Sequence, residues 1–115
     1  MKDNSNKLAV LWTGNDPDAA EKMVFMYTLN AKKQGWFQEV VLIIWGPSAK
    51  LATENKMIAD YIQRMQEAGV KTEACMHCAK MYNVHEQLAD MNVDVKSMGV
   101  PLTNYLKEGW KVLSL

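Results

Sequence analysis

The sequence predicts a single α/β domain, a three-layer α/β/α sandwich around a mainly parallel five-stranded sheet. Short apolar runs rich in β-branched residues alternate with longer segments whose apolar residues recur at helical spacing. Strands joined through helices return to the same edge of a sheet and therefore pair in parallel. A length of 115 residues with 49% hydrophobic residues suits one domain with its own core. We expect a short polar tail at residues 1–6 and the domain at residues 7–115.

The first strand and helix have clear sequence signals. Residues 8–13 are almost wholly apolar, which is typical of a central strand covered on both faces. Asp16 can cap a helix, and Pro17 suits the first helical turn. Apolar residues then recur at helical spacing until Gly35, so one helix is predicted up to that glycine.

The next two strands frame a long helix. The second strand lies within residues 37–45, and Gly46 and Pro47 break it. A single helix is predicted from there to Gly69. Residues 70–74 form a third, shorter strand that ends at Cys75.

The last third of the chain is predicted to hold two more strands and short helices. These segments are a helix to residue 81, a helix over 85–91, a strand over 93–98, a helix around 102–106 and a strand over 110–115. Right-handed crossovers then give the three layers.

The charge balance excludes some function classes. Thirteen lysines and arginines match thirteen aspartates and glutamates, so the chain lacks the positive footprint of nucleic-acid and anionic-membrane binders. Its longest apolar run, residues 40–45, is too short to span a bilayer. The polar N-terminus has no apolar signal-peptide core. We expect a cytoplasmic protein that has no membrane span and binds no nucleic acid.

Ligands of such folds bind beyond the carboxyl ends of the strands, where two loops supply candidate binding residues. The first loop contributes Gly14 and Asn15, and the second contributes Gly46 and Ser48. An anion could bind at the second loop, but it lacks the glycines of a P-loop, so we favour plain helix capping by Ser48. Asp16 is likewise interpreted as a cap rather than as half of an acid–base pair.

Two cysteines follow the third strand. Cys75 and Cys78 are three residues apart, and such a pair in a reducing compartment is more often catalytic, redox-active or metal-binding than structural. If Cys75 caps a helix, nearby free amides favour its thiolate, the nucleophilic form. His77 or Lys80 would have to help stabilise the Cys75 thiolate. Cys78 could act as the resolving thiol that attacks Cys75 after it has been modified. The alternative is that both are small apolar residues packed under a helix.

A metal site is a competing interpretation of the same segment. Cys75, His77, Cys78 and His85 supply four donors within eleven residues. A structural zinc site normally takes its second pair of ligands from a separate knuckle, so we predict neither a metal nor a cofactor. His85 is instead interpreted as a helix N-terminal or surface residue.

The order of elements and the end of the chain resemble a known family. Residues 98–106 (Met-Gly-Val-Pro-Leu-Thr-Asn-Tyr-Leu), residues 109–112 (Gly-Trp-Lys-Val) and Cys75 after the third strand together resemble the DsrE/DsrF-like family, which has the YchN-like α/β fold. The resemblance implies a sulfur-relay protein that carries sulfur as a persulfide on Cys75, nine residues before Val84. It also implies sulfur donors and acceptors, either proteins or small thiols, as partners and a homo-oligomer, a trimer or a hexamer.

Two functions remain open at this point. The first is a sulfur carrier with sulfurtransferase-like chemistry at Cys75, with Cys78 as resolving thiol. The second is a non-catalytic oligomeric module that binds a partner, a small ligand or a metal.

Overall fold

The computed structural model describes residues 4–115, with five strands in one parallel sheet. The strands are β1 (Lys7–Trp12), β2 (Glu39–Ile44), β3 (Lys71–Cys75), β4 (Asp94–Lys96) and β5 (Lys111–Ser114). Their order is β4-β3-β2-β1-β5, and every neighbouring pair is parallel. The predicted fold class is confirmed.

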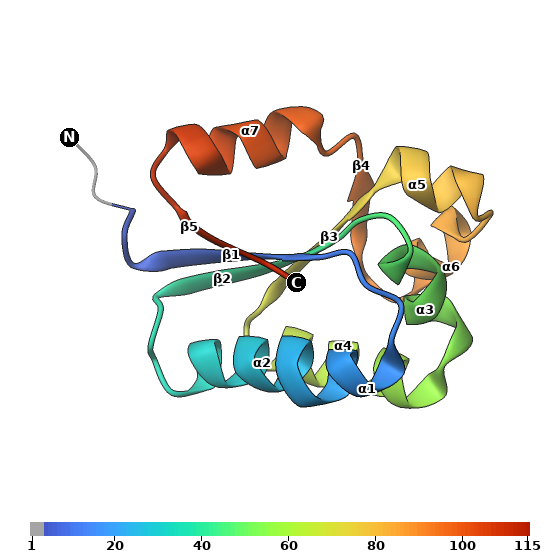
Figure 1. Ribbon diagram of the computed structural model, residues 1–115, viewed down its shortest axis with the longest axis horizontal. Helices are drawn as coiled ribbons and strands as arrows, with labels where there is room; N and C mark the ends of the chain where they lie inside the picture. Colours follow the sequence, from blue (N-terminus) through green and yellow to red (C-terminus); the bar gives the residue numbers. More distant parts are fainter. Residues whose placement is uncertain (1–3) are drawn as a thin grey trace.

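Helices cover both faces of this sheet (Figure 1). They are α1 (Pro17–Ala19), η1 (Ala20–Phe25), α2 (Met26–Lys33), α3 (Ser48–Glu54), α4 (Lys56–Glu67), α5 (Met76–Met81), α6 (His85–Asp90) and α7 (Gly99–Lys107). The layer of α1, η1, α2 and α4 lies on one face and α7 lies on the other, while α3, α5 and α6 gather at one end of the sheet (Figure 1). None of these helices is long and apolar enough to cross a bilayer, as far as residues 4–115 show.

The start of the first predicted helix is confirmed, and its interior differs from a regular helix. Asp16 Oδ1 accepts a hydrogen bond from the Asp18 backbone N–H at 3.0 Å, and Pro17 is the first helical residue. The segment then passes through a π-helical stretch, η1, before α2 begins.

The single helix predicted up to Gly69 is wrong, because it is divided at Asn55. This residue has an extended backbone and ends α3. Its side-chain Oδ1 accepts from the Ile58 N–H at 3.2 Å, so that it caps α4. Asparagine is a preferred N-cap residue, and the side-chain bond compensates for the interrupted helix.

The sheet separates a large apolar core from a smaller one. The large core lies between the sheet and the layer containing α2 and α4. The smaller one, on the α7 face, consists of Ala9, Val41, Ile43, Cys75 and Met98. One of the two candidate cysteines therefore belongs to the core beneath α7.

The structure describes only part of the expected N-terminal tail at residues 1–6. Residues 1–3 of the expected tail lie outside the described residues. Asn4 is buried, and its Nδ2 donates to the backbone oxygen of Glu108 at 2.7 Å. This bond joins the start of the described chain to the end of α7.

Candidate functional site

Cys75 occupies the expected place in the fold but not the expected environment. It is the last residue of β3 and the N-cap residue of α5. Only 6% of its surface is exposed, and its side chain makes no capping hydrogen bond to α5. The expectation that Cys75 caps the helix with its sulfur near free amides is therefore wrong. The residue that precedes a helix need not direct its side chain at the helix, and here the sheet face takes it into an apolar cluster.

Cys78 is the more accessible thiol of the pair. It lies half-buried in the first turns of α5, and both cysteines are free. Burial raises the pKa of the Cys78 thiol, a hydrogen bond from the Gly46 backbone lowers it in part, and a hydrogen bond with Cys75 and the charge of that neighbour raise it again. The two thiols are thus close neighbours, and the proximity of Cys75 contributes to the raised pKa of Cys78.

The Gly46 loop belongs to the same site. Gly46 has a φ of 73°, in the left-handed region that favours glycine. This conformation turns the chain from β2 into α3, and the Gly46 backbone hydrogen-bonds Cys78. The structure therefore brings one of the predicted loop residues to the cysteine pair.

Ser48 does not cap a helix, which corrects the sequence-based interpretation. Its hydroxyl donates to the Trp12 carbonyl oxygen at 2.6 Å and accepts from the Trp45 N–H at 3.1 Å. The N-cap position of α3 is Pro47 instead. Ser48 is fully buried, and it ties together the ends of β1 and β2. The strands rather than the helix satisfy this hydroxyl, and the sequence pattern contains no signal for that.

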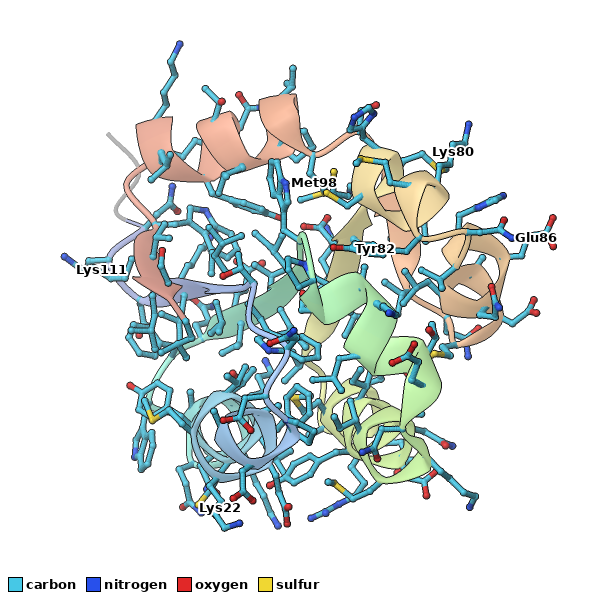
Figure 2. All side chains as sticks on the ribbon, turned by 45° about the vertical axis from the view of Figure 1, so that its right-hand side comes forward. Lys22, Lys80, Tyr82, Glu86, Met98 and Lys111 are labelled. Atoms are coloured by element: carbon cyan, nitrogen blue, oxygen red, sulfur yellow. The ribbon has the colours of Figure 1, made fainter. Side chains whose placement is uncertain are left out.

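The first loop lies beside a small pocket. Asn15 lines this pocket of about 270 Å³ together with Pro47, Lys50, Leu51, Glu54 and Tyr82. Figure 2 shows Tyr82 pointing inward. Gly14 is exposed and does not line the pocket.

The two residues expected to assist Cys75 are directed elsewhere. His77 and Lys80 are exposed on α5, and Lys80 points away from the rest of the molecule (Figure 2). Neither contributes to the interactions that set the Cys78 pKa. The structure therefore does not bring His77 or Lys80 together with the thiols.

The metal interpretation receives no geometric support. Within residues 4–115, no three His, Cys, Asp or Glu side chains come together as a metal site would require. His85 is the first residue of α6, as the sequence predicts for a helix N-terminal residue.

A buried polar cluster next to Cys75 was missed by the sequence analysis. Glu73 is fully buried, and its Oε1 accepts a hydrogen bond from the Tyr105 hydroxyl on α7 at 2.6 Å. Its Oε2 lies 2.6 Å from Lys96 Nζ, which also pairs with Asp94 at 2.8 Å. Burial raises the pKa of Tyr105, and the bond to Glu73 raises it further.

One sequence signal could have found this cluster. Side chains two residues apart on a strand share a face, so Glu73 lies on the same face of β3 as Cys75. Lys96 is the register partner of Cys75 on β4. A carboxylate on the buried face of a strand requires partners, and the tyrosine of the predicted last helix is one.

The comparisons with known proteins settle the family. The sequence matches the DsrE/DsrF-like family over residues 6–115. The chain belongs to this family. The expected resemblance is thereby confirmed, whereas no curated protein matches the chain.

Two solved structures are similar to this DsrE/DsrF-like chain. A conserved protein of unknown function, BT1422, from Bacteroides thetaiotaomicron is 37% identical, with a TM-score of 0.92 over 96% of this chain and 95% of that one. The ychN protein from E. coli is 13% identical, with a TM-score of 0.74 over 95% of this chain and 98% of that one. The second likeness shows a shared fold.

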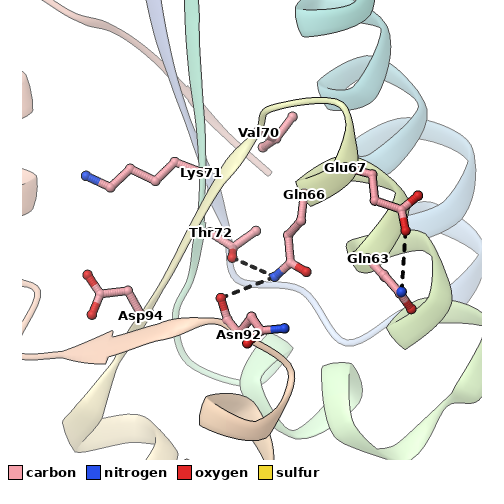
Figure 3. Close-up of a pocket in the computed structure, with 8 residues that line it drawn as sticks. All are labelled: Gln63, Gln66, Glu67, Val70, Lys71, Thr72, Asn92 and Asp94. Atoms are coloured by element: carbon pink, nitrogen blue, oxygen red, sulfur yellow. Dashed lines mark hydrogen bonds between the residues drawn. The ribbon is translucent and has the colours of Figure 1, made fainter.

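A second, polar pocket of this DsrE/DsrF-like chain is lined by residues that hold α4 against the sheet. It measures about 510 Å³ and lies between α4, the start of β3 and the turn before β4 (Figure 3). Gln66 Nε2 donates to Thr72 Oγ1 at 2.9 Å and lies 3.4 Å from the Asn92 carbonyl oxygen. These bonds brace α4 against the sheet. The pocket lies at the amino end of β3, whereas Cys75 is at its carboxyl end.

Proposed function

We propose that this protein is a sulfur carrier in which Cys75 holds a sulfane sulfur as a persulfide and Cys78 is its partner thiol. The observation that carries the proposal is the proximity of two free thiols at the carboxyl end of β3. Membership of the DsrE/DsrF-like family supports it, because the family resemblance implies sulfur relay through a cysteine at this strand end. The family membership thus supports a role in sulfur relay, and the pair of neighbouring thiols supplies the groups that could carry the sulfur.

Loading is a displacement between sulfur atoms. The Cys75 thiolate attacks the outer sulfur of a donor persulfide R–S–SH. A bond forms between Cys75 Sγ and that sulfur, the S–S bond of the donor breaks, and the products are Cys75–S–SH and R–S⁻. The departing R–S⁻ takes its proton from solvent, because the raised pKa of Cys78 makes that thiol a weak acid. No net oxidation or reduction takes place in this step.

Release can follow either of two balanced routes. An acceptor thiolate attacks the outer sulfur, takes it as a new persulfide and leaves the Cys75 thiolate, which again involves no net redox change. Alternatively, Cys78 first gives up its proton to a base in solvent, and the resulting thiolate attacks Cys75 Sγ and expels HS⁻. That route reduces the outer sulfur and oxidises the pair to a disulfide, so a dithiol reductant must restore the two thiols.

A second function is favoured by one observation, the burial of Cys75. A thiol that is 6% exposed suits a non-catalytic binding or assembly module of the same fold. Under this alternative both cysteines are packing residues, and Cys75→Ser leaves partner binding intact.

The partners and assembly are part of the proposal. We expect a cytoplasmic homo-oligomer, a trimer or hexamer, that exchanges sulfur with donor and acceptor proteins or small thiols. Met23, Met26 and Trp36 are 44%, 48% and 55% exposed and line one shallow pocket on the outer side of the α2 layer. Exposed apolar side chains gathered in this way are typical of contacts between protein chains. This patch is our candidate for the contact between copies.

Intact-mass spectrometry tests the sulfur-carrier function. The reduced protein is incubated with a small persulfide donor, and we expect a species heavier by one sulfur atom. Cys75→Ser abolishes this species, whereas Cys78→Ser retains it and releases it more slowly to a reductant-free buffer. A wild-type protein that gains no sulfur, or a Cys75→Ser protein that still gains it, contradicts the proposal.

A further inference from the structure

We infer that α7 is a lid over Cys75, and that the hydrogen bond between Tyr105 and Glu73 is the latch that holds it closed. The inference concerns access to the same site and rests on the proposed function for its biological meaning. Cys75 belongs to the apolar cluster that Leu102 and Tyr105 of α7 pack against. Figure 1 shows α7 covering that face of the sheet. Met98, just before α7, belongs to the same buried cluster. Figure 2 places Met98 beneath the beginning of α7.

The packing of α7 is weak for a helix of its length. None of its nine residues is buried, whereas α4 buries Ile58, Ile62 and Met65. Val100 and Leu106 on α7 are 71% and 57% exposed. Segments with few buried apolar contacts open locally more often than the rest of a protein. The helix that shields Cys75 is therefore suited to move without unfolding of the sheet.

The latch joins this weakly packed helix to the strand that carries Cys75. Tyr105 donates to Glu73 at 2.6 Å, two residues before Cys75 on β3. Another polar bond near α7, from Asn4 Nδ2 to the Glu108 carbonyl oxygen, lies beyond the end of the helix that is remote from Cys75. Tyr105 thus holds the part of α7 that packs against the Cys75 cluster.

The buried carboxylate explains why this latch can open and close. A buried carboxylate is unfavourable unless it is paired and hydrogen-bonded. Lys96 Nζ lies 2.6 Å from Glu73 Oε2 and belongs to the sheet rather than to α7, so movement of α7 does not require this ion pair to break. Only the Tyr105 bond is lost on opening, and water can replace it at the exposed carboxylate. The closed lid shields a persulfide from solvent thiols, and the open lid admits the donor or acceptor.

Thiol alkylation tests the lid without any sulfur-transfer step. The native protein is treated with iodoacetamide, and the rates at Cys75 and Cys78 are followed separately by peptide mass mapping. Tyr105→Phe removes the latch while keeping the ring. We expect it to raise the Cys75 rate roughly ten-fold, since a hydrogen bond to a charged group is lost from the closed state alone.

A matched control separates the lid from general loosening. Thr72→Val removes the hydrogen bond with Gln66 from the same strand on the α4 side, and it is expected to leave the Cys75 rate unchanged. A Tyr105→Phe rate within two-fold of wild type overturns the lid, as does an equal increase in Thr72→Val.

Amide hydrogen exchange of the wild-type protein tests the lid independently of any variant. Amides of α7 should exchange faster than those of α4, and equal protection of the two helices overturns the lid. Failure of persulfide loading with normal lid behaviour would remove the proposed function and leave the lid standing.

Discussion

The hydroxyl of Tyr105 donates to the carboxylate of Glu73 over 2.6 Å, and this bond crosses from α7 to the buried face of β3. Glu73 is fully buried and also pairs with Lys96. The bond therefore fixes a helix that buries none of its own residues against the strand that ends at Cys75.

Tyr105→Phe is expected to lower the free energy of unfolding. The buried Glu73 oxygen loses a donor, which costs about 1–2 kcal/mol. Urea denaturation measures the change. Tyr61→Phe is the matched control, because the Tyr61 ring packs against Phe25 and Arg64 lies over its face. We expect the control to change stability by less than about 0.5 kcal/mol.

The Cys78 thiol is expected to react with iodoacetamide at a higher pH than an ordinary thiol. Burial is the main cause of its raised pKa, and the neighbouring Cys75 contributes. Cys75→Ser should therefore move the midpoint of the pH–rate profile downward but not fully to the ordinary value. An unchanged midpoint in Cys75→Ser would show that the two thiols are not close neighbours.

The same shift predicts how stability depends on pH. The folded protein retains the Cys78 proton at pH values where the unfolded chain releases it, so stability falls as the pH rises through the alkaline range. Cys78→Ser should remove this part of the alkaline loss. Thermal unfolding of both proteins from neutral to alkaline pH measures it, and identical slopes would contradict the raised pKa.

Asn55→Ala is expected to destabilise the junction between α3 and α4 by about 1 kcal/mol, because α4 loses its N-cap. Thr53→Ala is the control, since its exposed hydroxyl bonds only the Lys50 carbonyl oxygen in its own helix. Guanidinium denaturation of the two variants checks the difference. Equal stability of Asn55→Ala and wild type would mean that the cap does not stabilise the break.

The sequence predicted the strands better than it predicted the ends of the helices. Buried strands such as Glu39–Ile44 are recognisable by a continuous apolar run rich in β-branched residues, and the Asp16–Pro17 cap is a local signal. The break at Asn55 was missed because apolar residues keep helical spacing on both sides of it. The spacing of apolar residues does not change at Asn55, so it gives no sign that the side chain of this residue ends one helix and caps the next.

The candidate site was predictable in position but not in environment. The rule that reactive groups lie beyond the carboxyl ends of strands located Cys75, Cys78 and Gly46 near one another. The burial of Cys75 and the bonding of Ser48 depend on residues far away in the chain, such as Met98 and Trp12. Such contacts arise only when the layers pack, so spacing alone could not reveal them.

Replacing Trp36 with glutamate is expected to dissociate the proposed homo-oligomer. The substitution puts a charge into the exposed patch of Met23, Met26 and Trp36, where burial of an unpaired carboxylate is unfavourable. Light scattering of wild type should give a trimer or hexamer, and the variant should give a smaller species. Replacing the exposed Lys107 with glutamate is the control and should not change the mass. A monomeric wild-type protein would contradict the expected assembly.

The most direct test of the sulfur-carrier function is to locate the transferred sulfur. The protein is loaded with a small persulfide donor, alkylated at once and digested, and the alkylated persulfide is assigned to a cysteine by fragment mass. We predict the extra sulfur on Cys75, and its loss on Cys75→Ser. A wild-type protein that carries the sulfur on Cys78 alone, or on neither cysteine, would contradict the account.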